Sequence, residues 1–376
     1  MLRKSDKQKF DFYEIQKTIK AYPNAHYYVV YGERSNGKTY SALNYALERW
    51  AKAGEEFAYI RRYAEDIRPK NLSSLFSSHV DNGVISRLTD GKWDGISYGS
   101  ARFYLNHTDE KGNTWKNDSP IGYAFDINSM EHNKSLSYPK VTTIIFDEFL
   151  SRSGYLPNEF VLFTNLISTI VRLRDNVKII MLGNTVNKTC PYFSEMGLTH
   201  VKEQKQDTID VYHYADSGLE VICEYTESAK KKGGKPSDVY FAFDNPELKM
   251  ITSGAWEIAI YPHLTTGYNK KDVVMDFFIE FEGELLHGEI ISSDTGPYVF
   301  IHEKTTPIQD EDNDIIYTDK PDIRWNHMMC MTKQRDKYSL FIIQALRENK
   351  IFYSTNEVGE IVRNYVLWSD SFSIKN

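Results

Sequence analysis

The sequence predicts an α/β protein with a doubly wound, mostly parallel sheet, followed by a smaller mixed α and β domain. Three observations support this prediction. Strands alternate with helices over roughly the first 200 residues. A Gly-x-x-x-x-Gly-Lys-Thr motif lies between a predicted strand and a predicted helix. A chain of 376 residues is also too long for one ordinary domain.

The N-terminal elements follow from apolar patterning. Apolar and β-branched runs predict strands at residues 27–31, 57–60, 96–105, 121–127, 141–146 and 177–182. Apolar residues at helical spacing predict helices at residues 39–50 and 158–172, the second with Pro157 at its start. This order of strands and helices is typical of a doubly wound fold.

A polar run from Lys230 to Ser237, with two glycines and a proline, predicts a linker. We therefore expect an N-terminal domain at 1–205, a linker region at 206–236 and a C-terminal domain at 237–376. A long surface loop inside one domain is the alternative. Apolar strands interrupted by turn residues at 282–283 and 294–296, and a helix at 338–347, predict a mixed second domain.

Composition excludes several classes of protein. The net charge of −7 and pI near 5.9 indicate a mildly acidic protein without a histone-like positive surface, and they neither favour nor exclude nucleic acid. Cys190, Cys223 and Cys330 are too widely spaced for a disulfide framework or a Cys-x-x-Cys metal site, which favours a reducing cytosol. No apolar run predicts a signal peptide or a membrane span, so we expect no membrane partner.

The glycine-lysine motif predicts a phosphate-binding loop for ATP. It reads Gly32-Glu33-Arg34-Ser35-Asn36-Gly37-Lys38-Thr39. Glycines let the backbone turn its N–H groups toward phosphate oxygens, and the following helix presents its positive end. We expect Lys38 to reach the β- and γ-phosphates and Thr39 to bind Mg²⁺.

Polar residues end two buried strands, where ligands of an open parallel sheet bind. Asp147 and Glu148 follow the strand at 141–146. We expect Asp147 to hold Mg²⁺ and Glu148 to take a proton from the attacking water as general base. Asn184 follows the strand at 177–182 and is a candidate sensor of the γ-phosphate, although it could simply cap a turn after Gly183.

Several arginines could supply the extra cation that phosphoryl transfer often requires. Arg34 lies in the phosphate-binding loop, and Arg61 and Arg62 end the strand at 57–60. Arg172 and Arg174 close the helix at 158–172. An arginine at a helix end is often only a surface cation that complements the helix dipole.

Five further stretches complete a recognisable set of motifs. They read Tyr59-Ile-Arg-Arg-Tyr63, Ser137-Tyr-Pro139, Thr143-Ile-Ile-Phe-Asp-Glu-Phe149, Tyr155-Leu-Pro-Asn-Glu159 and Pro191-Tyr-Phe193. Over roughly residues 27 to 195 the chain resembles the genome-packaging ATPases of phi29-like bacteriophages, which are related to large terminase subunits. The resemblance implies a P-loop motor of the additional-strand, catalytic-glutamate type.

The resemblance also implies roles for individual residues. Lys38 and Thr39 would bind nucleotide and Mg²⁺, Asp147 the metal, and Glu148 would activate water. Arg34 matches an arginine of that family's phosphate-binding loop. The family's trans-acting arginine corresponds to Arg172, and a basic residue that assists across the subunit boundary corresponds to Lys134. An arginine supplied in trans implies a ring, which we expect to have five subunits.

For the C-terminal domain the resemblance implies a vestigial ribonuclease-H-like fold without nuclease activity. Asp276, Glu280 and Glu282 lie on or beside one predicted strand, and Asp294 follows the next, but spacing cannot show whether they converge on two metal ions. We therefore expect solvated acids on a strand face, and a two-metal nuclease site is the alternative.

The motifs predict an ATPase, and the resemblance implies an ATP-driven translocase that packages double-stranded DNA into a preformed capsid through the portal. A packaging RNA is a further possible partner, and the expected location is the host cytoplasm and, transiently, the procapsid. A terminase with an active nuclease and a non-enzymatic nucleotide-binding scaffold for nucleic acid are the alternatives.

Overall fold

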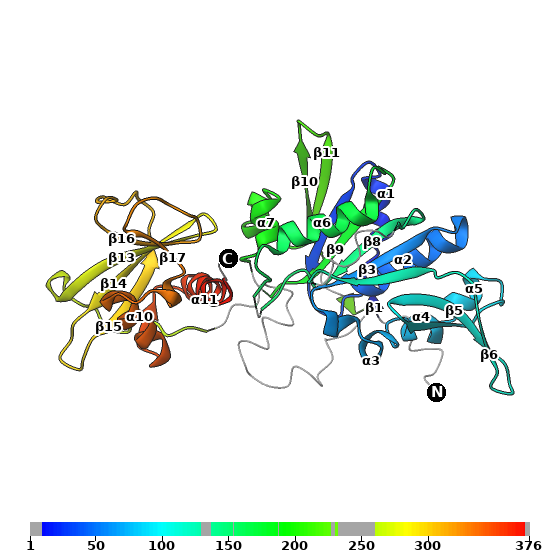
Figure 1. The fold of residues 1–376 in the computed structure, drawn as a ribbon, viewed down its shortest axis with the longest axis horizontal. Helices are drawn as coiled ribbons and strands as arrows, with labels where there is room; N and C mark the ends of the chain where they lie inside the picture. Colours follow the sequence, from blue (N-terminus) through cyan, green and yellow to red (C-terminus); the bar gives the residue numbers. More distant parts are fainter. Residues whose placement is uncertain are drawn as a thin grey trace. The chain divides into compact units, whose positions relative to one another are not determined.

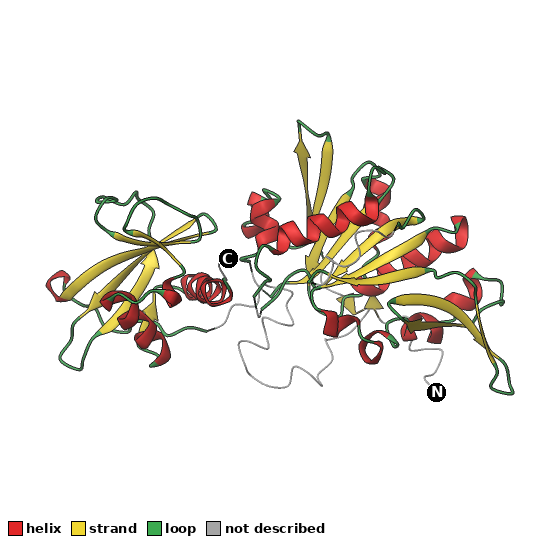
Figure 2. Ribbon diagram, in the orientation of Figure 1, coloured by secondary structure: helices red, strands yellow, loops and turns green. Residues whose placement is uncertain are grey.

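The computed structural model describes residues 10–128, 137–152, 154–186, 188–226, 230–231 and 260–372 (Figures 1 and 2). The chain divides into two compact units. The first comprises residues 1–151, 158–188 and 195–256, and the second comprises residues 152–157, 189–194 and 257–376. Two short segments of the N-terminal half therefore group with the C-terminal unit.

A 10-stranded sheet organises the first unit, in the order β10-β11-β2-β9-β8-β3-β7-β5-β4, with β6 paired to β5. The pairs from β11 to β7 are parallel, and the pairs at the two ends are antiparallel. The strands are β2 (Tyr27–Gly32), β3 (Glu56–Arg61), β4 (Gly95–Gly99), β5 (Arg102–Thr108), β6 (Thr114–Lys116), β7 (Gly122–Asp126), β8 (Val141–Asp147), β9 (Lys178–Asn184), β10 (Thr208–Tyr214) and β11 (Leu219–Tyr225). This large, mostly parallel sheet confirms the predicted α/β class.

The central strands bring the predicted site residues to one edge of the sheet. Strand β9 lies between β2 and β8, so one strand separates the phosphate-binding loop from the acidic pair. In the register Gly32 lies opposite Asn184, and Asp147 lies opposite Leu182. Because these strands are parallel, their carboxyl ends share this edge.

Helices cover both faces of this sheet. The core of one face joins α1 (Ile15–Ala21), α2 (Lys38–Ala53) and α5 (Val84–Leu88) to inward-facing strand residues such as Tyr59 and Ile145. On the opposite face α6 (Glu159–Val171) packs on β8, where the Phe163 ring stacks 5.1 Å from the Phe146 ring (Figure 1). Side chains alternate along β8, so Ile145 and Asp147 face α2, whereas Phe146 faces α6.

Two details of this sheet differ from the sequence prediction. The strand expected at 96–105 is a hairpin, β4 and β5, whose turn residues Ser100 and Ala101 have positive φ angles of 50° and 57°. This turn was missed because neither residue is a glycine or asparagine. Residues 208–225, expected within a linker, form β10 and β11, and β11 pairs with β2. Most of the polar run from Lys230 to Ser237 lies outside the described residues.

The C-terminal unit is built on a 6-stranded sheet in the order β17-β16-β13-β14-β15-β18. Strands β13, β14 and β15 are antiparallel neighbours, whereas β16 is parallel to β13, β17 to β16 and β18 to β15. The strands are β13 (Val273–Phe281), β14 (Glu284–Ile291), β15 (Tyr298–Glu303), β16 (Ile315–Thr318), β17 (His327–Met329) and β18 (Ile351–Tyr353). The expected turn at Glu282 and Gly283 joins β13 to β14.

Two helices close one face of this second sheet. The helix α10 (Lys337–Arg347) matches the predicted helix, and α11 (Asn356–Ser371) follows β18. Apolar residues of both helices form one core with the sheet residues Phe277 and Ile279. Asp336 caps α10 by accepting hydrogen bonds from the amides of Tyr338 and Ser339.

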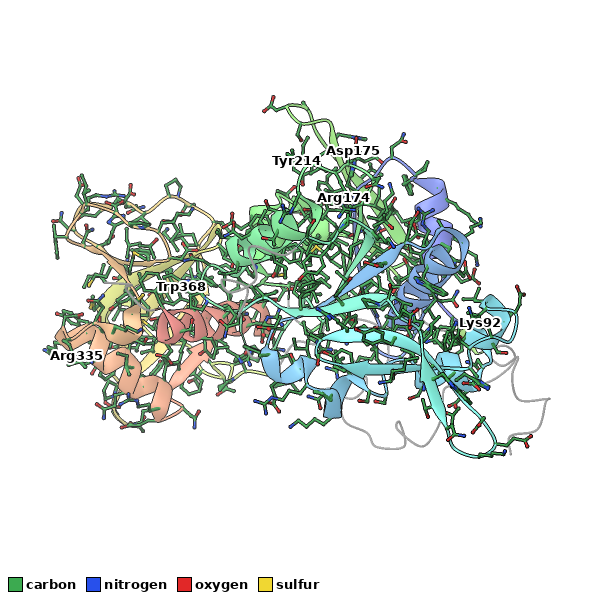
Figure 3. The ribbon with its side chains drawn as sticks, turned by 45° about the vertical axis from the view of Figure 1, so that its right-hand side comes forward. Lys92, Arg174, Asp175, Tyr214, Arg335 and Trp368 are labelled. Carbon is green, nitrogen blue, oxygen red and sulfur yellow. The ribbon has the colours of Figure 1, made fainter. Side chains whose placement is uncertain are left out.

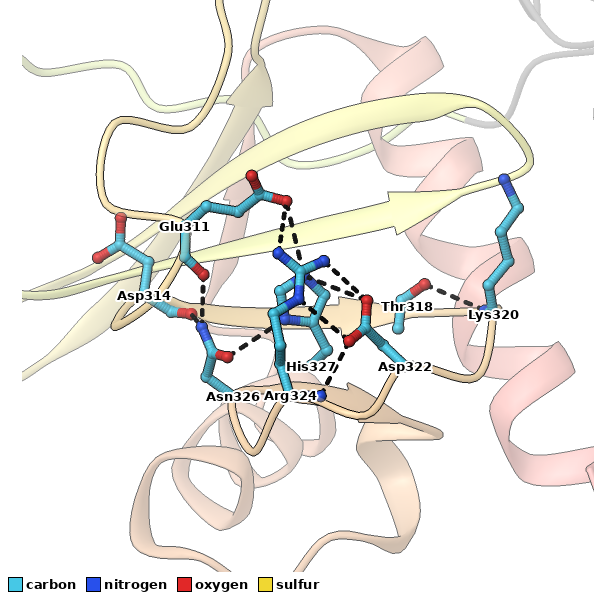
Figure 4. Close-up of polar contacts among 8 residues, drawn as sticks. All are labelled: Glu311, Asp314, Thr318, Lys320, Asp322, Arg324, Asn326 and His327. Atoms are coloured by element: carbon cyan, nitrogen blue, oxygen red, sulfur yellow. Dashed lines mark hydrogen bonds and ion pairs between the residues drawn. The ribbon is translucent and has the colours of Figure 1, made fainter.

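A network of polar contacts fixes the loop between β16 and β17 (Figure 4). The Arg324 guanidinium lies between the carboxylates of Asp322, at 2.7 Å, and Glu311, at 2.9 Å. The buried Asn326 amide donates to the main-chain carbonyls of Glu311 and Asp314. The loop therefore has a defined shape and exposes the neighbouring Trp325.

No helix among the described residues is both long and apolar enough to span a bilayer.

Candidate nucleotide-binding site

The phosphate-binding loop has the backbone conformations that its glycines allow. Gly32 has φ of 155°, and a Cβ atom there would lie 2.1 Å from Thr226 Oγ1. Gly37 has φ of 94° and precedes α2. The buried Asn36 amide donates to the same Thr226 hydroxyl at 2.8 Å. Thr226, which directly follows β11, thus supports the loop from the neighbouring strand.

Lys38 lies inside this loop with only 5% of its surface exposed. Its ammonium donates to the main-chain carbonyl of Glu33 at 2.6 Å and to the Asn36 side-chain oxygen at 3.1 Å. Burial lowers the pKa of Lys38 to about 8, although the Asp147 and Glu33 carboxylates oppose this shift. A buried cation held largely by neutral oxygens is well suited to bind an anion.

Thr39 and Asp147 meet across the sheet edge. The Thr39 hydroxyl lies 3.1 Å and 3.2 Å from the two oxygens of the Asp147 carboxylate. The Tyr59 hydroxyl, from β3, donates to the same carboxylate at 2.8 Å. Burial raises the pKa of Asp147, while Arg61 and the Tyr59 hydrogen bond act in the opposite direction. A hydroxyl and a carboxylate are oxygen ligands of the kind that Mg²⁺ prefers.

Glu148 is oriented differently from Asp147 because its backbone leaves the strand. Its φ of 62° is unusual for a residue other than glycine, and its amide donates to Asp147 Oδ1 at 3.1 Å. The Glu148 carboxylate is about half exposed and forms an ion pair with Arg61 at 2.5 Å. Arg61 thus holds the carboxylate that was predicted to be the general base.

Arg62 is buried and contacts the loop that follows β8. With 6% of its surface exposed, it pairs with Glu159, which is 2% exposed, at 2.8 Å. Its other nitrogens donate to the main-chain carbonyls of Glu148 at 3.1 Å and Phe149 at 2.7 Å. Arg62 therefore joins the end of β3, the loop after β8 and the first turn of α6.

Asn184 lies at the tip of β9, opposite Gly32 in the register. Its side-chain oxygen accepts a hydrogen bond from the Lys38 ammonium at 3.4 Å. The structure thus brings Asn184 together with Lys38, Thr39, Asp147 and Glu148. Arg34 lies in the loop with an exposed side chain, as does Ser35, which has φ of 61°.

Arg172 lies away from this edge. It ends α6, which runs back from the tip of β8 toward the start of β9, and a helix of 13 residues is about 20 Å long. Arg172 and Leu173 are exposed, and with Ser168 and Thr169 they line a surface hollow.

Arg174 instead has a structural role (Figure 3). Its guanidinium donates to five main-chain carbonyls, at distances of 2.6 to 3.2 Å, including those of Tyr138, Val141 and Ile170. Arg174 thus connects the end of α6 to the start of β8.

The remaining residues named from the sequence are Lys134 and the acids of the C-terminal domain. Lys134 lies outside the described residues. In the C-terminal unit, the described residues contain one group of three histidine or acidic side chains whose ligand atoms converge, and it consists of Asp276, His287 and Glu289. Asp276 is one of the four acids considered from the sequence, and Glu280, Glu282 and Asp294 are not part of this group.

Sequence reasoning missed three contributors to the site. Tyr59 was given no role at the site, Thr226 fell within the expected linker, and the partner of Arg62 was not foreseen. The double arginine at the end of β3 was the available signal, because two adjacent cations after a buried strand require carboxylate partners.

The fold and the geometry of this edge define a P-loop protein of the α/β class. The sequence profile of the podovirus DNA encapsidation protein (Gp16) matches residues 7–233. The chain belongs to this family of encapsidation proteins, which confirms the resemblance noted from the sequence.

Individual relatives agree with this assignment. The chain is 34% identical over 174 residues to a DNA packaging protein of Bacillus phage B103, covering 45% of this chain and 47% of that protein. It is 32% identical over 185 residues to a DNA packaging protein of Bacillus phage phi29, covering 48% and 49%. The matched region thus spans about half the length of each of these relatives.

Solved structures share the fold over nearly the whole chain. The bacteriophage phi29 genome packaging motor assembly aligns with a TM-score of 0.55 and 21% identity, covering 94% of this chain and 97% of that one. The Phi-28 gp11 DNA packaging motor aligns with a TM-score of 0.51 and 17% identity, covering 97% and 99%. At these identities the similarity concerns the fold.

Proposed function

We propose that this protein hydrolyses ATP to drive double-stranded DNA into a phage capsid. The observation that carries the proposal is the meeting of Thr39 and Asp147 between the phosphate-binding loop and the acidic strand, with Glu148 beside them. Membership of the encapsidation family supplies the biological setting.

The residues present fit a nucleotide with its metal. Lys38 provides a buried cation for the β- and γ-phosphates, and Thr39 and Asp147 provide the oxygen ligands for Mg²⁺. When bound, Mg²⁺ would neutralise charge on the phosphates and orient them. The positive end of α2 adds to the attraction for phosphate.

Glu148 is the general base in this proposal. Its carboxylate takes a proton from the attacking water, and for this step it must leave its ion pair with Arg61. Arg62 holds the backbone from which that carboxylate extends, through the Glu148 and Phe149 carbonyls. Asn184, in contact with Lys38, is placed to sense the γ-phosphate.

The position of Arg172 supports a ring of subunits. Because α6 carries Arg172 away from the phosphate-binding loop of its own chain, an arginine at this place serves a nucleotide better in a neighbouring subunit. Lys134 is proposed to assist across the same boundary. A ring of five subunits, bound to the portal of the procapsid and joined by a packaging RNA, extends this proposal.

The C-terminal sheet supports a ribonuclease-H-like fold. Three antiparallel strands, β15, β14 and β13, are followed by the parallel strands β16 and β17, so the spatial order is third, second, first, fourth, fifth. We propose that this domain has no nuclease activity. Incubation of the full chain with plasmid DNA and Mn²⁺ tests this point, since a terminase with an active nuclease would cut the plasmid.

Phosphate release in the presence of DNA tests the ATPase assignment. Lys38→Ala should abolish hydrolysis and weaken nucleotide binding, whereas Glu148→Gln should abolish hydrolysis and leave binding intact. Hydrolysis at the wild-type rate in either variant would contradict the assignment. Undetectable phosphate release from the unmodified chain would instead favour a non-enzymatic scaffold.

A mixing experiment tests the role of Arg172. Arg172→Ala subunits and Glu148→Gln subunits are each expected to be inactive alone, and mixed rings should recover part of the activity if the arginine acts across the boundary. Absence of recovery at every mixing ratio would refute the trans role.

A further inference from the structure

A separate cluster of metal-ligand side chains lies on the C-terminal sheet, outside the nucleotide site. Asp276 on β13 pairs directly with Glu289 on β14, and Phe278 pairs with His287. Side chains alternate along a strand, so Asp276, His287 and Glu289 share one face, opposite the core face that carries Phe277.

The potential ligand atoms of these three side chains converge. Their ligand atoms all lie within 4.8 Å of one another, and His287 Nε2 lies 2.7 Å from Asp276 Oδ1. Tetrahedral ligands about 2.1 Å from a metal lie about 3.4 Å apart, so small side-chain rotations would form a three-ligand site.

Neighbouring groups hold these side chains in place. The Tyr268 hydroxyl donates to the Glu289 carboxylate, and His302 Nε2 lies 3.8 Å from the same carboxylate. The His287 ring stacks on Phe278, with 4.9 Å between ring centroids. Contacts of this kind orient metal ligands and reduce the entropy lost when an ion binds.

The third ligand distinguishes this cluster from ordinary histidine-carboxylate pairs. His107 with Asp94, at 2.7 Å, and His200 with Asp210, at 2.8 Å, form comparable pairs in the first unit. Within the described part of the chain, Asp276, His287 and Glu289 are the one group of three such side chains whose ligand atoms all lie within 4.8 Å of one another. Two carboxylates directly opposite each other on neighbouring strands repel, and a bound cation removes this repulsion.

We propose that Asp276, His287 and Glu289 form a binding site for a divalent transition-metal ion, with Zn²⁺ as the preferred ion. One imidazole nitrogen and two carboxylate oxygens suit Zn²⁺, whereas Mg²⁺ favours oxygen ligands alone. The ion links β13 to β14 and leaves at least one coordination position for water. This site does not depend on the proposed function, because it shares no residue with the nucleotide site.

Calorimetric titration of the full chain with ZnCl₂, after removal of metals with a chelator, tests the proposal. We expect the unmodified chain to bind one Zn²⁺. This binding should be lost in His287→Gln and should be at least tenfold weaker in Asp276→Asn. Binding of Mg²⁺ is measured in Asp147→Asn, which lacks the proposed Mg²⁺ ligand of the nucleotide site, and we expect none there. His200→Gln, which removes one of the two-residue pairs, is the matched control and should bind Zn²⁺ like the unmodified chain.

Co²⁺ gives an independent readout, because its visible absorption reports coordination by nitrogen and oxygen ligands. The absorption should appear in the unmodified chain and in His200→Gln but not in His287→Gln, with circular dichroism confirming that each variant is folded. Zn²⁺ binding that is equal in His287→Gln and the unmodified chain would overturn the proposal, as would the absence of stoichiometric binding.

Discussion

Replacement of Arg62 by methionine tests how the loop after β8, which carries the proposed general base Glu148, is held in place. The change removes a buried ion pair with Glu159 and two hydrogen bonds to main-chain carbonyls, while the methionine retains most of the aliphatic volume. Leaving the Glu159 carboxylate buried without its partner costs about 3–5 kcal/mol. Each carbonyl left without a donor adds about 1–3 kcal/mol where it is buried.

The double variant Arg62→Met with Glu159→Gln separates these contributions. Removal of both charges should recover about 3–5 kcal/mol of the loss, because no buried charge remains. The remaining cost, about 2–6 kcal/mol if both carbonyls are buried, should belong to the carbonyls of Glu148 and Phe149. Chemical denaturation that follows the unfolding of the N-terminal unit measures both quantities.

A more exposed arginine–glutamate pair provides the control for this experiment. Arg49 and Glu55 form an equally close pair, with nitrogen to oxygen distances of 2.8 Å and 2.6 Å, but the Arg49 side chain is 43% exposed. Arg49→Met should therefore cost at most about 1 kcal/mol.

The functional consequence of Arg62→Met should fall on the rate of hydrolysis more than on nucleotide affinity, because Arg62 contacts the backbone of Glu148 and not the phosphate-binding loop. Unfolding free energies of Arg62→Met and Arg49→Met that agree within error would refute this reasoning.

Three further predictions concern the same edge of the sheet. Tyr59→Phe removes a buried donor to Asp147 and should lower the free energy of unfolding by about 1–3 kcal/mol in a denaturant titration, and an unchanged value would contradict the hydrogen bond. Because burial lowers the pKa of Lys38 to about 8, nucleotide affinity measured by calorimetry should fall as the pH rises above 8, where the free protein must take up a proton to bind phosphate. Lys38→Arg stays protonated and should show no such fall, so parallel pH profiles would argue against titration of Lys38. Arg61→Gln releases the Glu148 carboxylate and should raise phosphate release without DNA several-fold, and a loss of that activity would assign Arg61 a direct role in hydrolysis.

The fold of the nucleotide-binding edge could be predicted because its signals are local. Strands β2, β3, β8 and β9 are apolar on both faces, and the motif from Gly32 to Thr39 fixes the loop between β2 and α2. Once parallel strands are assigned, their polar tips must share an edge, which placed Asp147 and Asn184 together.

The parts that sequence reasoning missed depend on contacts between distant residues. No residue of strand β10 is fully buried, so it lacks the pattern of a core strand. The pairing of β11 with β2 joins segments far apart in the chain, and no local signal shows it. The pairing of Arg62 with Glu159 joins residues far apart in the chain. His287 is two residues from Glu289, but only the register of β13 with β14 brings Asp276 to them.

The division of the chain into units has a consequence for any attempt to separate them. The segments 152–157 and 189–194 group with the C-terminal unit, and in it the Arg363 guanidinium donates to the Arg152 carbonyl at 2.7 Å. Glu148 precedes the first segment by a few residues, and Asn184 precedes the second. A single proteolytic cut after β11 would therefore leave both segments on the N-terminal fragment, separated from the unit with which they group. The second segment carries the buried side chains of Cys190 and Tyr192. The same two segments connect the ends of β8 and β9 covalently to the C-terminal unit, so a displacement of that unit would also act on these two strand ends.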